Sequence, residues 1–216
     1  VKDIQEQELM RKASHLNDMA MAEITHFFKE GVTETDLAEQ LKKIYRDLGA
    51  DGLSFEPLFA FGSNAASGHH WPDDTRLKPG DCILVDIGCT WEGYCSDMTR
   101  TFFYKNVTQH QQEVYHTVLK ANEEAEKAVT PGIPLSSLDQ IARGIITDKG
   151  YGSAFTHRLG HFIGLEDHEF GDVSSASADK AVPGNIFSIE PGVYLENDMG
   201  VRVEDLVLVT DHGHEI

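Results

Sequence analysis

Two aspartates within an apolar hairpin constrain the fold more than any other feature of this sequence. Residues 83–87 alternate like a half-buried strand, and residues 94–103 indicate a second strand after a short turn. If the turn lies at residues 91–92, Asp86 stands directly opposite Asp97 on the same face, where like charges repel. A divalent cation between the two carboxylates would offset that repulsion. The hairpin therefore predicts a metal site.

The hairpin is one copy of an internal repeat. Asp86 follows Pro79 by seven positions, Glu190 follows Pro183 by seven, and each proline precedes a glycine and an apolar strand. Each copy follows two predicted helices and a segment with histidine, and each leads into a strand with a second acid. Pro-Gly before a strand is also common turn chemistry, but the matched acids favour a true repeat. Two halves packed about a pseudo-twofold axis would bring the acids to one site; they are Asp86, Asp97, Glu190 and Glu204.

Helical periodicity and capping residues predict four helices among the strands. Thr33 has an acid three positions later, which is an N-cap signature, and Gly49 marks the end of the helix that follows. The helices are expected over 3–29, 34–48, 109–129 and 135–149, and the strands over 53–61, 83–87, 94–103, 185–190, 193–195 and 201–209.

Composition excludes some classes of function. The formal net charge of −18 argues against nucleic acid and anionic membrane as partners, since both need a basic surface. The odd count of cysteines, without zinc-type spacing, argues against a disulfide framework, so we expect reduced thiols in a cytoplasmic protein. The sequence shows no signal peptide and no apolar run long enough to span a bilayer, and its start at Val1 suggests an excised domain.

Three further side chains join the two aspartates as candidate metal ligands. Glu190 ends an apolar strand, where a charge is costly unless it is paired or bound to metal. Glu204 shares a strand face with Arg202, so an ion pair between them is the simpler alternative. His161 follows His157 by four positions, but no glutamate comes after the first histidine, so the zinc-protease helix motif is absent.

Taken together, the candidate ligands are four carboxylates and one imidazole. Such mostly oxygen ligands favour Mn²⁺ or Co²⁺ and would also accept Zn²⁺. Four negative charges suit two cations better than one, as in sites where two metals share a hydroxide. The predicted ligands are Asp86, Asp97, His161, Glu190 and Glu204.

In this ordered combination the chain resembles the pita-bread metallopeptidases, which include methionine aminopeptidase, aminopeptidase P and prolidase. The resemblance spans nearly all 216 residues, and the short gap from Glu190 to Glu204 resembles that of the bacterial and archaeal Xaa-Pro dipeptidases more than that of methionine aminopeptidase. It rests on Val85-Asp-Ile-Gly88 with Tyr94-Cys-Ser-Asp-Met-Thr-Arg100, on His157-Arg-Leu-Gly-His-Phe-Ile-Gly-Leu165 with His168-Glu169, on Ser188-Ile-Glu-Pro-Gly192 and on Gly200-Val-Arg-Val-Glu-Asp205.

The resemblance implies an α+β, pita-bread (creatinase/aminopeptidase) fold, with two pseudo-symmetric halves and a curved antiparallel sheet flanked by helices. It implies a single catalytic domain over 1–216, with halves of roughly 1–107 and 108–216. Prolidases and aminopeptidase P normally carry an N-terminal creatinase-like domain; we expect this sequence to represent the catalytic domain without it, and we expect the full-length form to be a homodimer.

The resemblance also implies a role for each ligand. Asp86 would chelate the first metal, Asp97 and Glu204 would bridge both, and His161 and Glu190 would complete the second site. Glu190 would in addition accept and later return the proton during catalysis.

Further residues are implied to contact the substrate. His168 or His69 would stabilise the tetrahedral oxyanion, His157 would line the same pocket, and Arg202 would contact the substrate or support a ligand.

The implied activity is dinuclear-metal-dependent hydrolysis of the Xaa-Pro peptide bond, most simply by an Xaa-Pro dipeptidase (prolidase) acting on a proline-containing di- or oligopeptide. One alternative is an Xaa-Pro aminopeptidase (aminopeptidase P), which trims longer peptides. The other is a metal-free or non-catalytic binding protein with the same fold, although such relatives are expected to lose ligands, and all five are present here.

Overall fold

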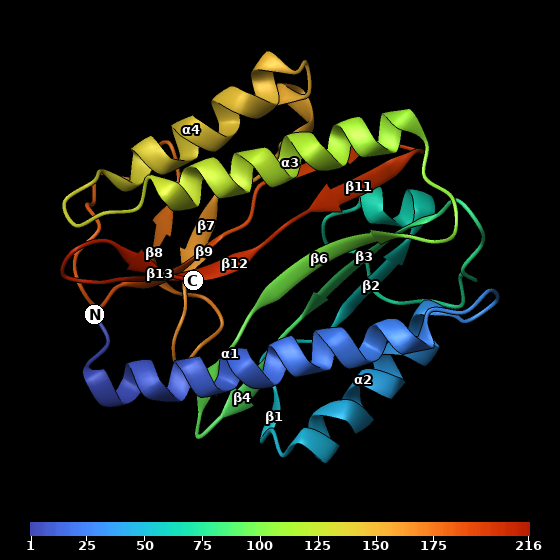
Figure 1. The fold of residues 1–216 in the computed structure, drawn as a ribbon, viewed down its shortest axis with the longest axis horizontal. Coiled ribbons are helices and arrows are strands. Elements are labelled where there is room, and N and C mark those ends of the chain that lie inside the picture. Colours follow the sequence, from blue (N-terminus) through green and yellow to red (C-terminus); the bar gives the residue numbers. More distant parts are fainter.

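Two pairs of helices enclose antiparallel sheets in the computed structural model, which describes all 216 residues (Figure 1). The first pair is α1 (Ile4–Ile24) and α2 (Glu34–Leu48), and the second is α3 (Gln109–Lys127) and α4 (Leu135–Asp148). The α+β class is confirmed, and all four predicted helices form. The first helix ends earlier than expected, in a short 3₁₀ turn, Thr25–Phe27.

The two halves repeat one strand topology. In each half two helices are followed by three strands, and the second strand lies between the first and the third. In each half a small hairpin separates the second strand from the third. The repeated strands are β2 (Leu58–Phe61), β3 (Cys82–Ile87) and β6 (Met98–Phe103) in the first half, and β7 (Gly160–Phe162), β9 (Ile186–Ile189) and β12 (Asp205–Val209) in the second.

The remaining elements are short. The second half's sheet extends at both edges, in the order β13-β12-β9-β7-β8. Two 3₁₀ turns, Gly62–Ala66 and Gly152–Ala154, precede histidine-bearing loops. The short strands are β1 (Gly52–Leu53), β4 (Cys89–Trp91), β5 (Tyr94–Cys95), β8 (Glu169–Val173), β10 (Gly192–Leu195), β11 (Met199–Arg202) and β13 (His214–Glu215).

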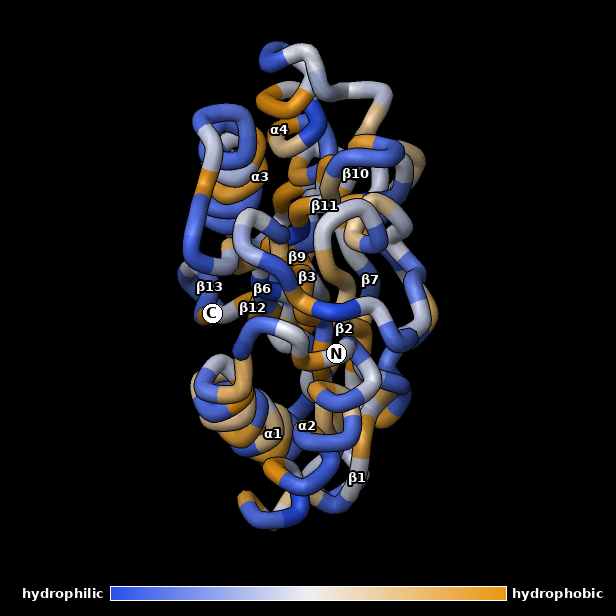
Figure 2. Tube along the Cα trace, turned by 90° about the vertical axis from the view of Figure 1, so that its right-hand side faces the viewer, coloured by the Kyte–Doolittle hydropathy of each residue, from blue (hydrophilic) through white to orange (hydrophobic).

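Strand β3 lies between two apolar cores. Its residues Ile83 and Val85 pack in the core formed with α1 and α2, whereas Leu84 packs in the core formed with α3 and α4. Apolar residues therefore occupy both faces of the strand, and they fill the middle of the molecule between the helix pairs (Figure 2). A charged side chain at the end of such a strand, such as that of Asp86, therefore points into the interior of the protein rather than into water.

The hairpin forms, but its predicted register is wrong by two residues. Asp86 pairs with Thr99 rather than with Asp97, and Trp91 pairs with Tyr94. The turn is therefore Glu92-Gly93, whose φ angles of 47° and 84° are both left-handed. Two left-handed residues match the twist of a hairpin, and glycine favours this conformation at the second position. Because the shift is an even number, Asp86 and Asp97 still reach the same cavity.

The strand predicted over 201–209 is broken at Val203 and Glu204. Strand β11 pairs with β10, and β12 pairs with β9, so the chain changes partner between them. At the break, Glu204 forms an isolated antiparallel bridge with Thr99 at the start of β6. This bridge joins the two halves at Glu204, a predicted ligand, and two residues after Asp97, another predicted ligand.

Local capping follows the sequence closely. Thr33 accepts a hydrogen bond from the amide of Asp36, and the Asp36 carboxylate accepts one from the amide of Thr33, which completes the expected capping box. Gly49 ends that helix with φ of 82°. None of the helices combines the length and the apolarity needed to cross a membrane.

Candidate metal centre

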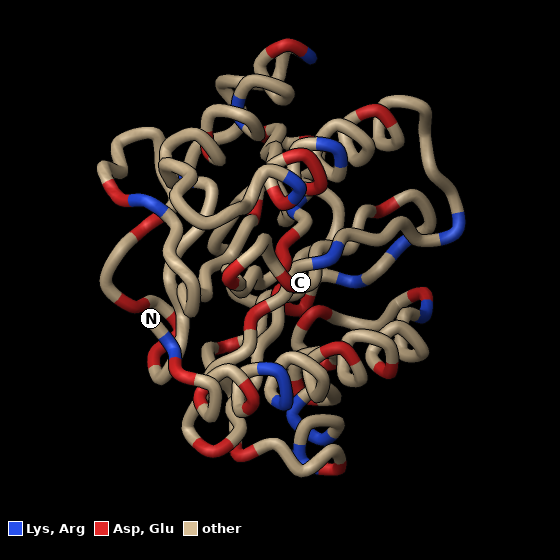
Figure 3. The backbone as a smooth tube through the Cα atoms, turned by 60° about the vertical axis from the view of Figure 1, so that its left-hand side comes forward, with Lys and Arg blue, Asp and Glu red and all other residues tan.

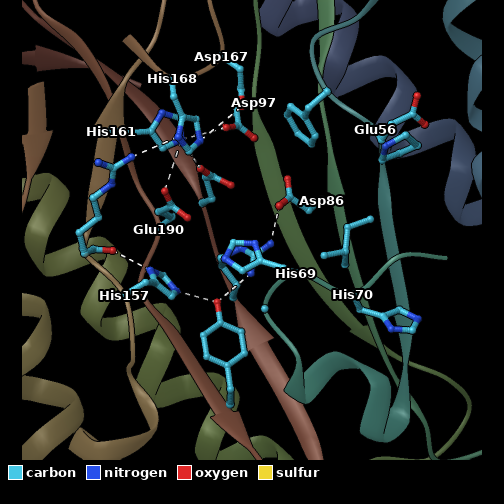
Figure 4. Close-up of a pocket in the computed structure, with 18 of the residues that line it drawn as sticks. Glu56, His69, His70, Asp86, Asp97, His157, His161, Asp167, His168 and Glu190 are labelled. Atoms are coloured by element: carbon cyan, nitrogen blue, oxygen red, sulfur yellow. Dashed lines mark hydrogen bonds and ion pairs between the residues drawn. The ribbon is translucent and has the colours of Figure 1, made fainter. Parts of the chain in front are cut away.

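One cavity of about 550 Å³ is lined by residues of both halves and collects every side chain that the sequence singled out (Figure 4). Its lining also includes polar residues that the sequence did not single out. The nine predicted residues in the lining are Asp86, Asp97, His161, Glu190 and Glu204 as ligands, and His69, His157, His168 and Arg202 on the substrate side.

Strand ends place the four carboxylates. Asp86 is the penultimate residue of β3, Asp97 precedes β6, Glu190 follows β9, and Glu204 lies between β11 and β12. The side chains of Asp97 and Glu204 are only 6% and 2% exposed. Burying this many carboxylates together is costly unless positive charge lies among them.

The imidazole of His161 faces the carboxylates with its unprotonated nitrogen. Its Nδ1 lies 3.2 Å from the carbonyl oxygen of Phe162, which can only accept, so Nδ1 carries the hydrogen. Its Nε2 lies 3.3 Å from Asp97 Oδ2, 3.5 Å from Glu190 Oε1 and 3.9 Å from Glu204 Oε1. Burial lowers the pKa of His161 to about 3, so the ring is neutral and these contacts are not ion pairs. A backbone-anchored imidazole with a free lone pair is the tautomer that binds a metal.

Three carboxylates are each anchored by a donor through one oxygen. Arg202 Nη2 donates to Asp86 Oδ2, Thr99 Oγ1 donates to Glu204 Oε2 at 2.6 Å, and Ser188 Oγ donates to Glu190 Oε1 at 3.1 Å. The other oxygens of Asp86 and Glu204, and Oδ1 of Asp97, are buried without a hydrogen-bond partner. Carboxylates that are held in place through one oxygen and leave the other oxygen free are typical of metal sites.

Burial and crowding also raise the pKa values of several carboxylates in the cavity. Burial, followed by the charge of Glu204, holds the pKa of Asp97 well above its ordinary value, and burial, followed by the charge of Glu190, does the same for Glu204. Burial raises the pKa of Glu190 to about 7. Divalent cations among these groups would favour their ionised forms. Metal-binding atoms of Asp97, His161 and Glu204 all lie within 4.8 Å of one another, so the residues fit a metal site.

A second cluster of acids and histidine, Glu34, His70 and Asp73, differs in one decisive way. The fully buried carboxylate of Glu34 has four partners: the amides of Phe61 and Asp73, the side chain of Asn64, and His70 Nε2 at 2.6 Å. With both oxygens satisfied, Glu34 is a structural anchor for the loop that carries His69. The free oxygens distinguish the site around His161.

At one end of the cavity a hydrogen-bonded chain holds His157. Its Nδ1 donates to the carbonyl oxygen of Arg158 at 2.7 Å, so its Nε2 accepts from the hydroxyl of Tyr194 at 2.8 Å. The Tyr194 oxygen in turn accepts from Arg202 Nη1 at 2.8 Å. Arg202 forms its ion pair with Asp86, so the alternative in which it simply neutralises Glu204 is wrong.

At the other end His168 stacks on His161, with 3.8 Å between ring centroids. Arg158 Nη2 donates to His168 Nδ1 at 3.2 Å, which leaves the hydrogen of His168 on Nε2. That nitrogen lies 3.4 Å from Oδ2 of Asp167. His69 is exposed and its ring makes no hydrogen bond, so both of its nitrogens are free for a ligand.

The sequence interpretation missed Tyr194, Asp167 and Glu34. Asp167 had a signal, since it lies in the histidine-rich segment beside His168. Tyr194 and Glu34 had none, because a tyrosine in a strand and an acid in the first turn of a helix are common without any functional role.

Comparison with known proteins places this site in context. Residues 8–211 match the model of metallopeptidase family M24. An uncharacterized peptidase of Staphylococcus aureus (strain MW2) is 43% identical over all 216 residues. The chain covers 62% of the length of that relative, so the relative has further residues outside the match.

Solved structures of similar fold cover the whole chain. A prolidase from Pyrococcus furiosus superposes with a TM-score of 0.98 at 35% identity, and the match covers 64% of that chain. An X-Pro aminopeptidase from Thermotoga maritima gives a TM-score of 0.97 at 36% identity over 61% of its chain. An Xaa-Pro dipeptidase from Bacillus anthracis gives 0.98 at 33% identity over 61% of its chain.

Proposed function

Because the chain belongs to metallopeptidase family M24, we propose that it holds two divalent metal ions in this cavity and that it hydrolyses the peptide bond before proline. The observation that carries the proposal is the set of buried carboxylate oxygens without partners around the neutral Nε2 of His161. Asp86, Asp97, His161, Glu190 and Glu204 would hold the ions, of which Mn²⁺ or Co²⁺ suits the ligands best and Zn²⁺ is acceptable.

Glu190 is the proposed proton acceptor and donor. Bound metal ions would supply Lewis acidity and a water nucleophile at neutral pH. The carboxyl of Glu190 is half-buried at the cavity wall, and Ser188 anchors one of its oxygens. The carboxylate that Ser188 holds in place would take a proton from the water and then return it to the departing proline nitrogen.

Histidines and Arg202 surround the remaining space. His168 carries its hydrogen on Nε2, and His69 has a free ring, so either can donate to the oxyanion that forms at the scissile carbonyl. His157 and Arg202 are linked through Tyr194 and form a rigid wall for the substrate. Because these hydrogen bonds already fix both side chains, the two side chains need to move little during the reaction.

The substrate class rests on the named relatives. The similar structures are described as a prolidase, an Xaa-Pro dipeptidase and an X-Pro aminopeptidase, all at about a third identity. Proline has no amide hydrogen, so its peptide bond suits a dedicated pocket. Cleavage of Xaa-Pro dipeptides is the first candidate activity. Removal of Xaa from longer Xaa-Pro peptides is the second, favoured by the likeness to the Thermotoga enzyme.

Elemental analysis coupled to peptide assays tests the proposal. The purified protein is expected to contain Mn, Co or Zn, to release proline from Xaa-Pro, and to lose this activity on treatment with EDTA. Asp97→Asn removes a proposed bridging ligand and should abolish both metal content and turnover. The control Asp179→Asn makes the same change of charge at an exposed site and should alter neither.

Several results would contradict the proposal. Full activity of Asp97→Asn after metal-free preparation would exclude the metal site, and activity that survives EDTA would favour a metal-free enzyme. A protein that binds no metal and cleaves neither Xaa-Pro nor Xaa-Pro-Yaa would favour a binding protein. Preference for the tripeptides would select the aminopeptidase. Light scattering of a longer chain would test the expected homodimer.

A further inference from the structure

Asp167 is a cavity carboxylate that the proposed mechanism does not use. It lies beside His168 and Asp97, and its neighbour Glu166 is exposed and outside the cavity lining (Figure 4). Its Oδ1 is buried and has no hydrogen-bond partner. Its Oδ2 has only His168 Nε2, at 3.4 Å. Of the acids in this loop, Asp167 is therefore the one that faces the cavity without a close partner.

The chain supplies no positive charge for Asp167. His168 accepts a hydrogen bond from Arg158 at Nδ1, so its ring has a single hydrogen, on Nε2, and does not offset the charge. The nearby acid Glu169, in contrast, pairs with Lys2. The four carboxylates of the proposed ligand set balance the charge of two divalent ions by themselves. A cavity carboxylate left with an unpaired oxygen is stabilised when a ligand brings a cation.

The position of Asp167 in the cavity indicates which part of a substrate it would meet. In Figure 4 it lies at the end of the cavity near His168 and His161, away from His157 and His69. The anionic carboxylate of proline suits the opposite end, where the Arg202 guanidinium and the free ring of His69 line the cavity. Proline has no cationic side chain, so any cation that varies between Xaa-Pro substrates must come from Xaa.

We propose that Asp167 binds an ammonium or guanidinium group on the side chain of the residue before proline, so that the enzyme prefers lysine or arginine at that position. This inference rests on the proposed Xaa-Pro hydrolase function. The cavity of about 550 Å³ lies within the range of roughly 300–1,000 Å³ that holds small ligands. Asp167 would act as a specificity residue and would leave the chemistry to the metal-binding groups.

Paired dipeptides test this role. Lys-Pro and Met-Pro have unbranched Xaa side chains of similar length, and both carry an α-ammonium, so the ratio of their kcat/KM values isolates the side-chain cation. The wild-type protein should favour Lys-Pro. Asp167→Asn should lower the ratio by about tenfold, mainly through the KM of Lys-Pro, as expected for one charge-assisted hydrogen bond. Asp167→Glu should retain part of the preference.

Glu166→Gln is the matched control, because it makes the same change of charge on the adjacent, exposed residue. It should leave the ratio unchanged. An unchanged ratio in Asp167→Asn, or an equal loss for both dipeptides, would overturn the inference. Loss of metal from Asp167→Asn by elemental analysis would also overturn it, since Asp167 would then be a ligand. If the metal-loaded wild-type protein cleaves no Xaa-Pro dipeptide, the proposed function fails, and this inference fails with it.

Discussion

Single hydrogen bonds decide the protonation of the cavity histidines. His157 and His161 each donate Nδ1–H to the backbone carbonyl of the next residue, so each presents an unprotonated Nε2. The Nε2 of His157 accepts from Tyr194, and that of His161 faces the carboxylates. Two histidines of the same short motif thus acquire different partners from the same local geometry. One suits a metal ligand and the other a fixed wall of the pocket.

The partly buried His157 should make the protein sensitive to acid. Burial lowers its pKa from 6.5 to about 4. Above pH 6.5 the ring is neutral whether the chain is folded or unfolded. Below pH 6.5 the unfolded chain takes up a proton that the folded chain does not, so stability falls with pH until about 4. Between pH 7 and 5 the wild-type protein should lose about 2 kcal/mol more than His157→Gln.

Urea unfolding in EDTA at both pH values measures the loss of stability in each protein, and the other titrating groups cancel when the loss of the variant is subtracted from that of the wild type. Equal losses in the two proteins would show that His157 takes up its proton in the folded state.

At the scale of elements, close contact between β7 and β9 sets the position of two ligands. Gly160 and His161 lie on β7, and Ser188 lies on β9, two residues before Glu190. The Ser188 hydroxyl accepts from the amide of His161 and donates to Glu190. A Cβ added at Gly160 would lie 1.8 Å from the carbonyl oxygen of Ser188. Glycine therefore allows the approach that brings His161 and Glu190 together.

Gly160→Ala should accordingly destabilise the protein by about 2 kcal/mol or more, because backbone must move to relieve the clash. Gly144→Ala is the matched control. That glycine lies in α4 with open space around it, and alanine there should stabilise the helix by roughly 0.5–1 kcal/mol. Thermal and urea unfolding measure both changes. A Gly160→Ala protein as stable as wild type would show that the two strands can separate without cost.

At the scale of the whole molecule, the candidate ligands tie the two halves together. Asp86 and Asp97 come from the first half, and His161, Glu190 and Glu204 come from the second. Acidic residues outnumber basic ones by 36 to 18 and spread over both halves (Figure 3). Bound cations would therefore bridge the halves and also reduce a large excess of negative charge.

Metal should therefore stabilise the folded protein. Mn²⁺ at a hundred times its dissociation constant should add about 2.7 kcal/mol to the free energy of unfolding, since the unfolded chain does not assemble the site. Differential scanning calorimetry with Mn²⁺ and with NaCl of equal ionic strength separates specific binding from screening. Asp97→Asn should lose the stabilisation and Asp179→Asn should keep it. Equal shifts in both variants would indicate general charge screening.

The sequence alone was enough to predict the four helices, the caps at Thr33 and Gly49, the strand repeat and the family. Those features depend on local signals, such as Thr33 with Asp36 and the spacing of Pro183 and Glu190, which act over a few residues. All nine candidate site residues also lie around one cavity, although their roles remain predictions. Strand ends in a repeated topology converge, so acids at those ends could be expected to meet.

Only the tertiary structure decided the hairpin register, the partner of Arg202 and the positions of Asp167 and Tyr194. A shift of two residues leaves the same side chains on the same face, so the pattern of apolar residues cannot detect it. Arg202 pairs with Asp86, 116 residues away, rather than with the nearby Glu204. Such contacts depend on how the two halves pack, because side chains distant in the chain meet only after the sheets and helices have assembled.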